Sequence, residues 1–152
     1  MKNKPHLTAI ARTKPSAPMT LLNKQHRLTG RTLDYGCGRG FDADCFDMER
    51  YDPHYFPKEP DGLFDTITCN YVLNVISRTR QADVLSHIRS FLKPDGVAYV
   101  TVRRDITHDY KTKNSVQRVV RLPLPIIEEN DGYCIYFVLK YLEGDLPLER
   151  GY

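Results

Sequence analysis

Three glycines that alternate with other residues mark the place where this sequence could bind a ligand. Gly36, Gly38 and Gly40 lie in the stretch TLDYGCGRGFD, residues 32–42, shortly after Asp34. Glycine lets the chain turn sharply and brings the backbone close to a ligand, because it has no Cβ. A strand that ends in such a turn and runs into a helix is typical of a nucleotide-binding site.

The spacing of the glycines separates this turn from two other nucleotide-binding turns. A dinucleotide site has the pattern Gly-x-Gly-x-x-Gly and would need a glycine where this sequence has Phe41. A P-loop would need Gly-Lys-Ser or Gly-Lys-Thr, which does not follow. Because Asp42 and Asp44 follow the turn, its surroundings are acidic and suit a ligand that carries positive charge and no phosphate.

The turn resembles motif I of the class I S-adenosylmethionine (SAM)-dependent methyltransferases, and SAM is the cofactor that this resemblance implies. In that family the leading acid, here Asp34, lies near the amino-acid end of the cofactor. A second acid, at the end of the next strand, holds the ribose hydroxyls through charge-assisted hydrogen bonds. Asp52 stands in that position, directly before Pro53.

Further segments extend the resemblance over residues 31–103. PDGLFDTITCNYVLNVI (60–76) is similar to the fourth-strand region of the family, and FLKPDGVAYVTV (91–102) to its fifth strand. The resemblance implies these cofactor-binding residues: Asp34, Tyr35, Gly36, Gly38, Gly40, Asp52, Pro53 and Asn70. Residues 53–63 are too few and too rich in proline for the family's third strand, so we expect Tyr55, Phe56 and Asn70 to form the adenine pocket.

A narrower resemblance rests on four segments: ARTKPSAP (11–18), LDYGCGRG (33–40), YDPHYFP (51–57) and NYVLNVI (70–76). Together they are similar to the methyltransferase associated with DNA phosphorothioation gene clusters. Proteins of that group are longer, so the resemblance implies a pared-down domain.

The candidate catalytic residues are Asn70, Tyr71 and His54. Methyl transfer mostly needs alignment of the reactants, and needs a base only when the nucleophile must lose a proton early. DNA amino-methyltransferases carry Asn/Asp-Pro-Pro-Tyr/Phe where this chain has CNYVL, without the prolines; Asn70 could still accept a hydrogen bond from an amine. His54 could cover the cofactor, act as a base or lie on the surface. Arg12, Lys14 and Ser16 could fold over the cofactor's carboxylate or hold substrate.

Strands that alternate with helices must position these residues. We expect strands at 31–35, 49–53, 64–70 and 97–103, and helices from Ser16 through Leu22, within 41–48 and over 81–93. Strands at 116–124 and 132–142 should form an antiparallel pair. The predicted fold class is α/β, a Rossmann-like class I methyltransferase sheet that is mostly parallel, has an antiparallel carboxy-terminal edge and lacks the third strand.

Positive charge gathers in two stretches of the sequence. Residues 2–31 contain lysines and arginines but no acid, residues 34–65 are acidic, and residues 103–121 are basic again. Basic flanks could attract nucleic acid, and a solvated surface is the alternative.

Length and composition set the remaining expectations. A chain of 152 residues forms one domain, 1–152, with a basic amino-terminal extension at 1–30. We expect no membrane association, because no apolar run approaches about 20 residues. The cysteines and histidines lack metal-ligand spacing, so we expect no metal and a reducing, cytoplasmic location.

The sequence therefore predicts a SAM-dependent methyltransferase that acts on a nucleic acid or a nucleotide-like acid. Two alternatives stay open. One is a SAM-binding fold that has lost catalysis and serves as an interaction or regulatory subunit for a partner protein. The other is a small-molecule methyltransferase, to which the segment VLNVI is similar.

Overall fold

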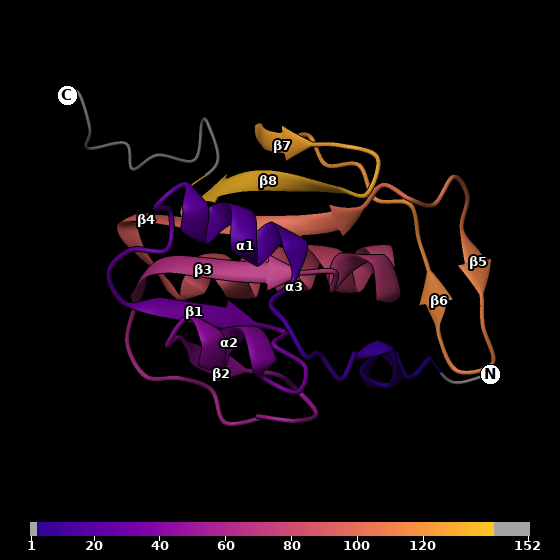
Figure 1. Ribbon diagram of the computed structural model, residues 1–152, viewed down its shortest axis with the longest axis horizontal. Helices are drawn as coiled ribbons and strands as arrows, with labels where there is room; N and C mark the ends of the chain where they lie inside the picture. Colours follow the sequence, from indigo (N-terminus) through magenta and orange to yellow (C-terminus); the bar gives the residue numbers. More distant parts are fainter. Residues whose placement is uncertain (1–2, 142–152) are drawn as a thin grey trace.

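Four parallel strands form the centre of the sheet in the computed structural model, which describes residues 3–141. They are β1 (Thr32–Tyr35), β2 (Glu49–Tyr51), β3 (Phe64–Asn70) and β4 (Leu92–Arg103). The inner strand β3 is rich in β-branched and apolar side chains, as a strand covered on both faces must be. The strand order in the whole sheet is β2-β1-β3-β4-β8-β7 (Figure 1).

Two antiparallel strands complete the sheet beside β4. Strand β8 (Tyr133–Leu139) pairs along β4 from Val97, opposite Leu139, to Arg103, opposite Tyr133. Strand β7 (Ile126–Glu129) pairs with β8 at the outer edge. The predicted fold class, a mostly parallel α/β sheet with an antiparallel carboxy-terminal edge, is confirmed.

The sheet is reduced at its other edge, where β2 is the last strand. Within residues 3–141 nothing pairs with the outer side of β2, and the chain that follows makes only an isolated bridge between Asp52 and Phe56. The expected absence of a third strand therefore holds for the described part of the chain.

Helices cover both faces of the sheet and create two separate cores. Helices α1 (Ala17–Lys24) and α2 (Phe41–Cys45) pack on one face, with Met19 and Leu22 against Tyr99 and Ile135. Helix α3 (Arg78–Ser90) packs on the other face, where Ile88 joins the larger core cluster. Figure 1 shows α1 in front of the sheet and α3 behind it.

The strand order creates a crevice at the carboxyl ends of β1 and β3. The chain leaves β1 towards β2 on one side, whereas β3 leads to β4 on the other side. Ligands bind at such a switch point in open α/β sheets, because the connections diverge there and leave room above the strand ends.

An amino-terminal segment and a small hairpin lie beyond this crevice. The segment, residues 3–12, is called the strap below and contains a short 3-10 helix, η1 (Pro5–Thr8). The hairpin consists of β5 (Tyr110–Lys111) and β6 (Val116–Gln117). The backbone N–H of Lys4 donates to the carbonyl of Asn114, at 2.6 Å, so the strap and the hairpin touch.

Helix α3 lies three residues earlier than the sequence predicted. The Ser77 side chain accepts a hydrogen bond from the backbone N–H of Arg80, at 3.3 Å, so the helix begins at residue 78 instead of 81. It ends at residue 90 because Leu92 already pairs with Phe64 in the sheet.

The predicted strand at 116–124 was wrong. Only Val116–Gln117 is extended, and it pairs with β5 in the separate hairpin; the partner of β8 is β7. Pro123 and Pro125 have no backbone N–H to donate to a ladder, whereas Ile126 and Ile127 after them suit a strand. The predicted strand at 132–142 ends at residue 142, which lies outside the described residues. The predicted single domain, 1–152, also includes residues 1–2 and 143–152, which lie outside them.

Within residues 3–141 no helix is both long and apolar enough to cross a bilayer.

Candidate active site

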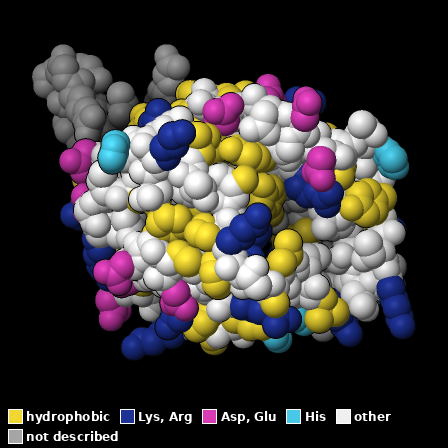
Figure 2. Space-filling model, viewed as in Figure 1, with side chains coloured by type: hydrophobic (Ala, Val, Ile, Leu, Met, Phe, Trp, Pro, Cys, Tyr) yellow, Lys and Arg dark blue, Asp and Glu magenta, His cyan; other side chains and the backbone are white. Residues whose placement is uncertain are grey.

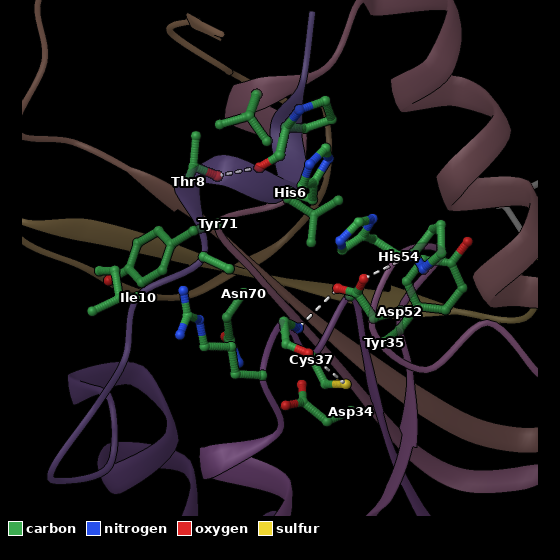
Figure 3. Close-up of a pocket in the computed structure, with 18 of the residues that line it drawn as sticks. His6, Thr8, Ile10, Asp34, Tyr35, Cys37, Asp52, His54, Asn70 and Tyr71 are labelled. Atoms are coloured by element: carbon green, nitrogen blue, oxygen red, sulfur yellow. Dashed lines mark hydrogen bonds between the residues drawn. The ribbon is translucent and has the colours of Figure 1, made fainter. Parts of the chain in front are cut away.

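A pocket of about 440 Å³ occupies the crevice at the carboxyl ends of β1 and β3. Figure 3 shows Tyr71 and Ile10 on one side of it, Asp52 and His54 on the opposite side, and Asn70 between them. The residues that the methyltransferase resemblance implies for cofactor binding and the three candidate catalytic residues all line this pocket: Asp34, Tyr35, Gly36, Gly38, Gly40, Asp52, Pro53, His54, Asn70 and Tyr71.

The glycine turn needs its glycines for two reasons. Gly36, Gly38 and Gly40 have φ angles of 72°, 55° and 87°, a region that residues with a Cβ avoid. A Cβ at Gly36 would clash with Cγ2 of Val72, and one at Gly38 would lie 3.3 Å from Cβ of Ala9 in the strap. The turn therefore brings bare backbone to the floor of the pocket.

Asp52 is held firmly at the end of β2 by backbone donors. Its Oδ2 accepts from the N–H of Gly38 at 2.9 Å, and its Oδ1 accepts from those of His54 and Tyr55 at 2.9 and 3.0 Å. Oδ2 can accept one further hydrogen bond, whereas both lone pairs of Oδ1 are already used. Asp52 thus joins the glycine turn to the loop after β2 and can still accept a hydrogen bond from a ligand hydroxyl.

Asp34 is a buried carboxyl group on the floor of the pocket. It is 3% exposed, and its Oδ1 accepts a hydrogen bond from the Thr68 hydroxyl at 2.8 Å. Burial raises the pKa of Asp34 to about 7, and the charges of Asp42 and Asp52 act in the same direction, while the Thr68 hydrogen bond and Arg12 oppose the shift. A bound cation would favour the ionised form.

This burial predicts a pH dependence of SAM binding. In the free protein the Asp34 carboxyl holds its proton up to its pKa of about 7, whereas an exposed aspartate loses it near 4. The protonated Asp34 carboxyl therefore stabilises the fold fully at low pH, and this stabilisation is lost as the pH rises through about 7. A cationic cofactor binds best to the ionised form of Asp34, so SAM should bind more tightly as the pH rises through 7. Below pH 7, binding of SAM should release the proton of the Asp34 carboxyl.

Calorimetric titration of SAM in two buffers with different ionisation enthalpies measures that proton. Asp34→Asn removes the titrating group and should flatten the pH profile between pH 5.5 and about 8. An identical profile in the Asn variant would contradict the assignment.

Asn70 carries the clearest sign that the pocket binds something. Both polar atoms of its side-chain amide are buried and have no hydrogen-bond partner among the described residues. An unpaired buried amide is costly, and such groups usually face a ligand or water. Its neighbour Tyr71 has a φ of 62°, an uncommon value for a residue with a side chain and one that marks many functional sites.

The strap covers the pocket on the side of Asp52. The ring of His6 stacks on that of His54, with centroids 3.9 Å apart, and the Tyr55 hydroxyl donates to the carbonyl of His6 at 3.3 Å. His54 therefore lies beside Asp52 and against the strap, across the pocket from Tyr71 (Figure 3).

The residues expected around adenine are arranged differently from the prediction. Of Tyr55, Phe56 and Asn70, only Asn70 lines the pocket; Phe56 lies under the guanidinium of Arg50, 4.3 Å from the ring centroid. Tyr35 lines the pocket, but its hydroxyl is 2.6 Å from Nδ1 of His87. Apolar side chains that the sequence did not single out also line the pocket: Val72, Val75, Ile76 and Val84.

Ser16 has a structural partner rather than a ligand-binding role. Its backbone N–H and its hydroxyl donate to the two oxygens of Asp42, at 2.9 and 2.7 Å, so its side chain does not cap α1. This buried contact fastens the start of α1 to α2. Arg12 lines the pocket, whereas Lys14 is exposed and lies outside it.

Other segments supply residues that the sequence gave no reason to expect at the site. Gln117 comes from β6, Arg103 from the end of β4 and Arg80 from α3. They are far apart in the sequence, and only the topology brings them together. Among residues 3–141, no three His, Cys, Asp or Glu side chains come together to hold a metal ion.

The residues present suit a nucleoside with a cationic amino-acid tail. The glycine turn offers close backbone contact, Asp52 offers an acceptor for hydroxyl groups, and Asp34 offers a buried carboxylate for positive charge. The unpaired amide of Asn70 offers one donor group and one acceptor group.

Comparisons with known proteins agree with this geometry. Residues 8–143 match a family model described as a methyltransferase domain. A comparison with curated proteins found no match.

The solved structures that resemble the fold include two with bound cofactor or its product. One is DhpI in complex with SAM and HEP, with a TM-score of 0.60 and 14% identity over 80% of this chain and 84% of that chain. The other is 1,6-didemethyltoxoflavin-N1-methyltransferase from Burkholderia thailandensis with 1,6-didemethyltoxoflavin and S-adenosylhomocysteine (SAH). It has a TM-score of 0.63 and 16% identity over 80% of this chain and 76% of that chain.

Proposed function

This chain belongs to the methyltransferase-domain family, and on that basis we propose that it transfers a methyl group from SAM to a nucleic acid or a nucleotide-like acid. The observation that carries the proposal is the pocket itself. It combines the glycine turn, the carboxylates of Asp34 and Asp52 and the unpaired amide of Asn70 at one switch point of the sheet.

When bound, SAM supplies a methyl group whose C–S bond breaks as the acceptor's lone pair bonds to the carbon, the electron pair staying on the sulfur of SAH. The protein's part is to hold and align the reactants. Asp52 would hold the ribose hydroxyls and Asp34 the positively charged amino-acid end. The glycine turn would lie against the cofactor through its backbone.

The acceptor side of the pocket would be formed by Asn70 and Tyr71. The free amide of Asn70 can hold the accepting group in place. Burial raises the pKa of Tyr71, so its phenol stays protonated at neutral pH and acts as a hydrogen-bond donor rather than as a base. His54 lies across the pocket and stacks on His6, so we assign it to covering the cofactor.

The two basic stretches support an acidic acceptor. The strap belongs to the first stretch and the β5–β6 hairpin to the second, and the bond between Lys4 and Asn114 joins them beside the pocket. Lys111 and Lys113 on the hairpin are exposed. Figure 2 shows Lys and Arg side chains at the edge of a hollow in this face. The link to DNA phosphorothioation belongs to the same proposal and rests on the sequence segments alone.

A small-molecule acceptor is the second candidate, and the size and covering of the pocket favour it. A volume of about 440 Å³ lies in the lower part of the range for small-molecule pockets. The strap lies over the pocket, and Ala9 approaches the glycine turn. One structural neighbour is named for a small heterocyclic acceptor, 1,6-didemethyltoxoflavin.

Calorimetric titration with SAM and SAH, followed by transfer of labelled methyl groups, tests the proposal. We expect micromolar binding of the cofactor, and labelling of nucleic acid or of nucleotides when each is offered separately. If nucleic acid is the acceptor, its binding should weaken steeply as salt rises. A folded protein that binds neither SAM nor SAH would overturn the proposal, and binding without transfer to any fraction would favour the inactive, partner-dependent alternative.

The proposed location is the cytoplasm. Cys37, Cys45, Cys69 and Cys134 are all free thiols, which suits a reducing compartment. Cys69 lies in β3 and is 0% exposed, so we assign it a packing role in the core.

A further inference from the structure

The pocket contains more arginine side chains than the cofactor needs. Four arginines line it, and they come from four different elements: Arg12 from the strap, Arg39 from the glycine turn, Arg80 from α3 and Arg103 from the end of β4. SAM has a single carboxylate.

Most of this positive charge has no acidic partner within the described part of the chain. Arg103 is the exception, because its Nε and Nη2 donate to the two oxygens of Asp105 at 2.8 Å each. The guanidinium of Arg39 lies 6.0 Å from the ring centroid of Tyr55. The guanidinium groups of Arg12 and Arg80 form no ion pair with any residue in 3–141.

The pocket also contains three acids, Asp34, Asp42 and Asp52, which equal in number the arginines other than Arg103 but accept their hydrogen bonds from neutral groups. Both oxygens of Asp42 accept hydrogen bonds from Ser16, and those of Asp52 accept from three backbone N–H groups. Asp34 accepts from Thr68. None of the three makes an ion pair with an arginine of the pocket.

The cofactor shifts this balance towards positive charge. SAM carries a sulfonium, an ammonium and one carboxylate, so its net charge is positive. Arg12 is half-buried, whereas Arg39 and Arg80 are exposed, so Arg12 gains most from a further anion. An acceptor that carries an anionic group would supply that charge.

Arg12 is placed to receive this anion on the acceptor side. Burial raises the pKa of Tyr71, and the charges of Arg12 and Arg103 act against that shift; Arg12 also acts on Asp34. Arg12, Tyr71 and Asp34 all line the same pocket. Gln117 also lines the pocket, and its Oε1 is buried and has no hydrogen-bond partner among the described residues.

We infer that the methyl acceptor is an organic anion whose carboxylate or phosphate group binds to Arg12, beside Tyr71 and Gln117, while its accepting atom lies at Asn70. The inference rests on the proposed function and specifies its acceptor. Arginine suits both anions because its planar guanidinium offers paired N–H donors. The unpaired Oε1 of Gln117 can accept a hydrogen bond from an N–H or O–H group next to the charge.

The test uses the full chain saturated with SAH and titrated with three probes: inorganic phosphate, benzoate and a short single-stranded oligonucleotide. Arg12→Gln removes the charge, and Lys14→Gln is the matched control, because it makes the same charge change two residues away on an exposed side chain outside the pocket. Arg12→Lys keeps the charge but loses the paired donors.

We expect saturable binding of phosphate or benzoate to the SAH complex, weakened roughly tenfold or more by Arg12→Gln and unchanged by Lys14→Gln. Arg12→Lys should fall between them. Binding of phosphate with weak salt dependence identifies a small phosphate-bearing acceptor, and oligonucleotide binding that is lost with rising salt identifies a nucleic acid. Benzoate binding identifies a carboxylate.

Two outcomes would overturn the inference while leaving the proposed function intact. In the first, SAH binds but none of the probes does, or Arg12→Gln and Lys14→Gln behave alike. In the second, Arg12→Gln weakens SAH itself yet leaves the affinity for 5′-methylthioadenosine unchanged. That compound has no amino-acid tail, so this result would assign Arg12 to the cofactor's carboxylate. Failure of SAH to bind the wild type would instead count against the proposed function.

Discussion

Gly36→Ala is expected to abolish measurable SAM binding and to lower the stability of the protein. At its φ of 72° a residue with a Cβ costs about 1–2 kcal/mol, and the new Cβ would clash with Cγ2 of Val72. Relief of the clash has to move either the turn or Val72, and both line the pocket. Calorimetry with SAM and thermal unfolding of the free protein measure the two effects.

Gly132→Ala is the matched control for this substitution. Gly132 lies in the turn between β7 and β8, outside the pocket, and the nearest atom to its Cβ would be Oδ1 of Asn130 at an ordinary 3.4 Å. The control should bind SAM like the wild type. If Gly36→Ala also binds SAM with unchanged affinity, the backbone of the turn is not in contact with the cofactor.

Asp52→Ala is expected to have the second large effect, a loss of SAM affinity of ten- to a hundred-fold. Each charged hydrogen bond to a ribose hydroxyl contributes roughly 1.5–3 kcal/mol. The variant also leaves the N–H groups of Gly38, His54 and Tyr55 without their acceptor, so the free protein should lose about 1–3 kcal/mol of stability.

Two further variants separate the ligand contact from the structural one. Asp52→Asn keeps one acceptor oxygen for the backbone, so it should recover part of the stability but little of the affinity. Asp61→Ala removes an exposed acid from the following loop, outside the pocket, and should change neither. Unchanged SAM affinity in Asp52→Ala would show that the ribose lies elsewhere.

The glycine turn and the strands beside it could be predicted because their signals are local. The Asp-x-Gly-x-Gly-x-Gly pattern sets the shape of the turn, and the β-branched run at 64–70 is strand β3 with the predicted bounds. Residues next to the ends of β1, β2 and β3 meet in any parallel sheet of this order. Asp34, Asp52 and Asn70 therefore came together as expected.

The rest of the pocket could not be predicted, because its residues are brought together by long-range packing. Gln117 reaches the pocket from a two-residue strand, and Ile10 from the strap. Asn74, one turn beyond Asn70, is buried and structural: it donates to the carbonyl of Arg118 and accepts from the N–H of Arg103. No period or spacing in the sequence distinguishes these roles.

The antiparallel edge shows the same limit. The segment at 116–124 has strand-like composition, but pairing depends on which backbone groups are available to a neighbour. Because Pro123 and Pro125 have no N–H to donate, pairing with β8 begins only after them, in β7, where Ile126 lies opposite Tyr136. Composition indicated a strand in this part of the chain but did not determine its register.

Among the described residues no strand pairs with the outer side of β2, and the features of this edge resist accidental pairing with other sheets. An unpaired strand offers free N–H and C=O groups that can template aggregation, and charge and shortness are the usual protections. Strand β2 has only three residues, two of them charged: Glu49 binds Arg31 at 2.7 Å, and Arg50 binds Asp44 at 3.2 Å. The following loop carries Pro53, Pro57 and Pro60, which cannot donate to a ladder. A sheet whose edge strand is this short and charged can stay monodisperse.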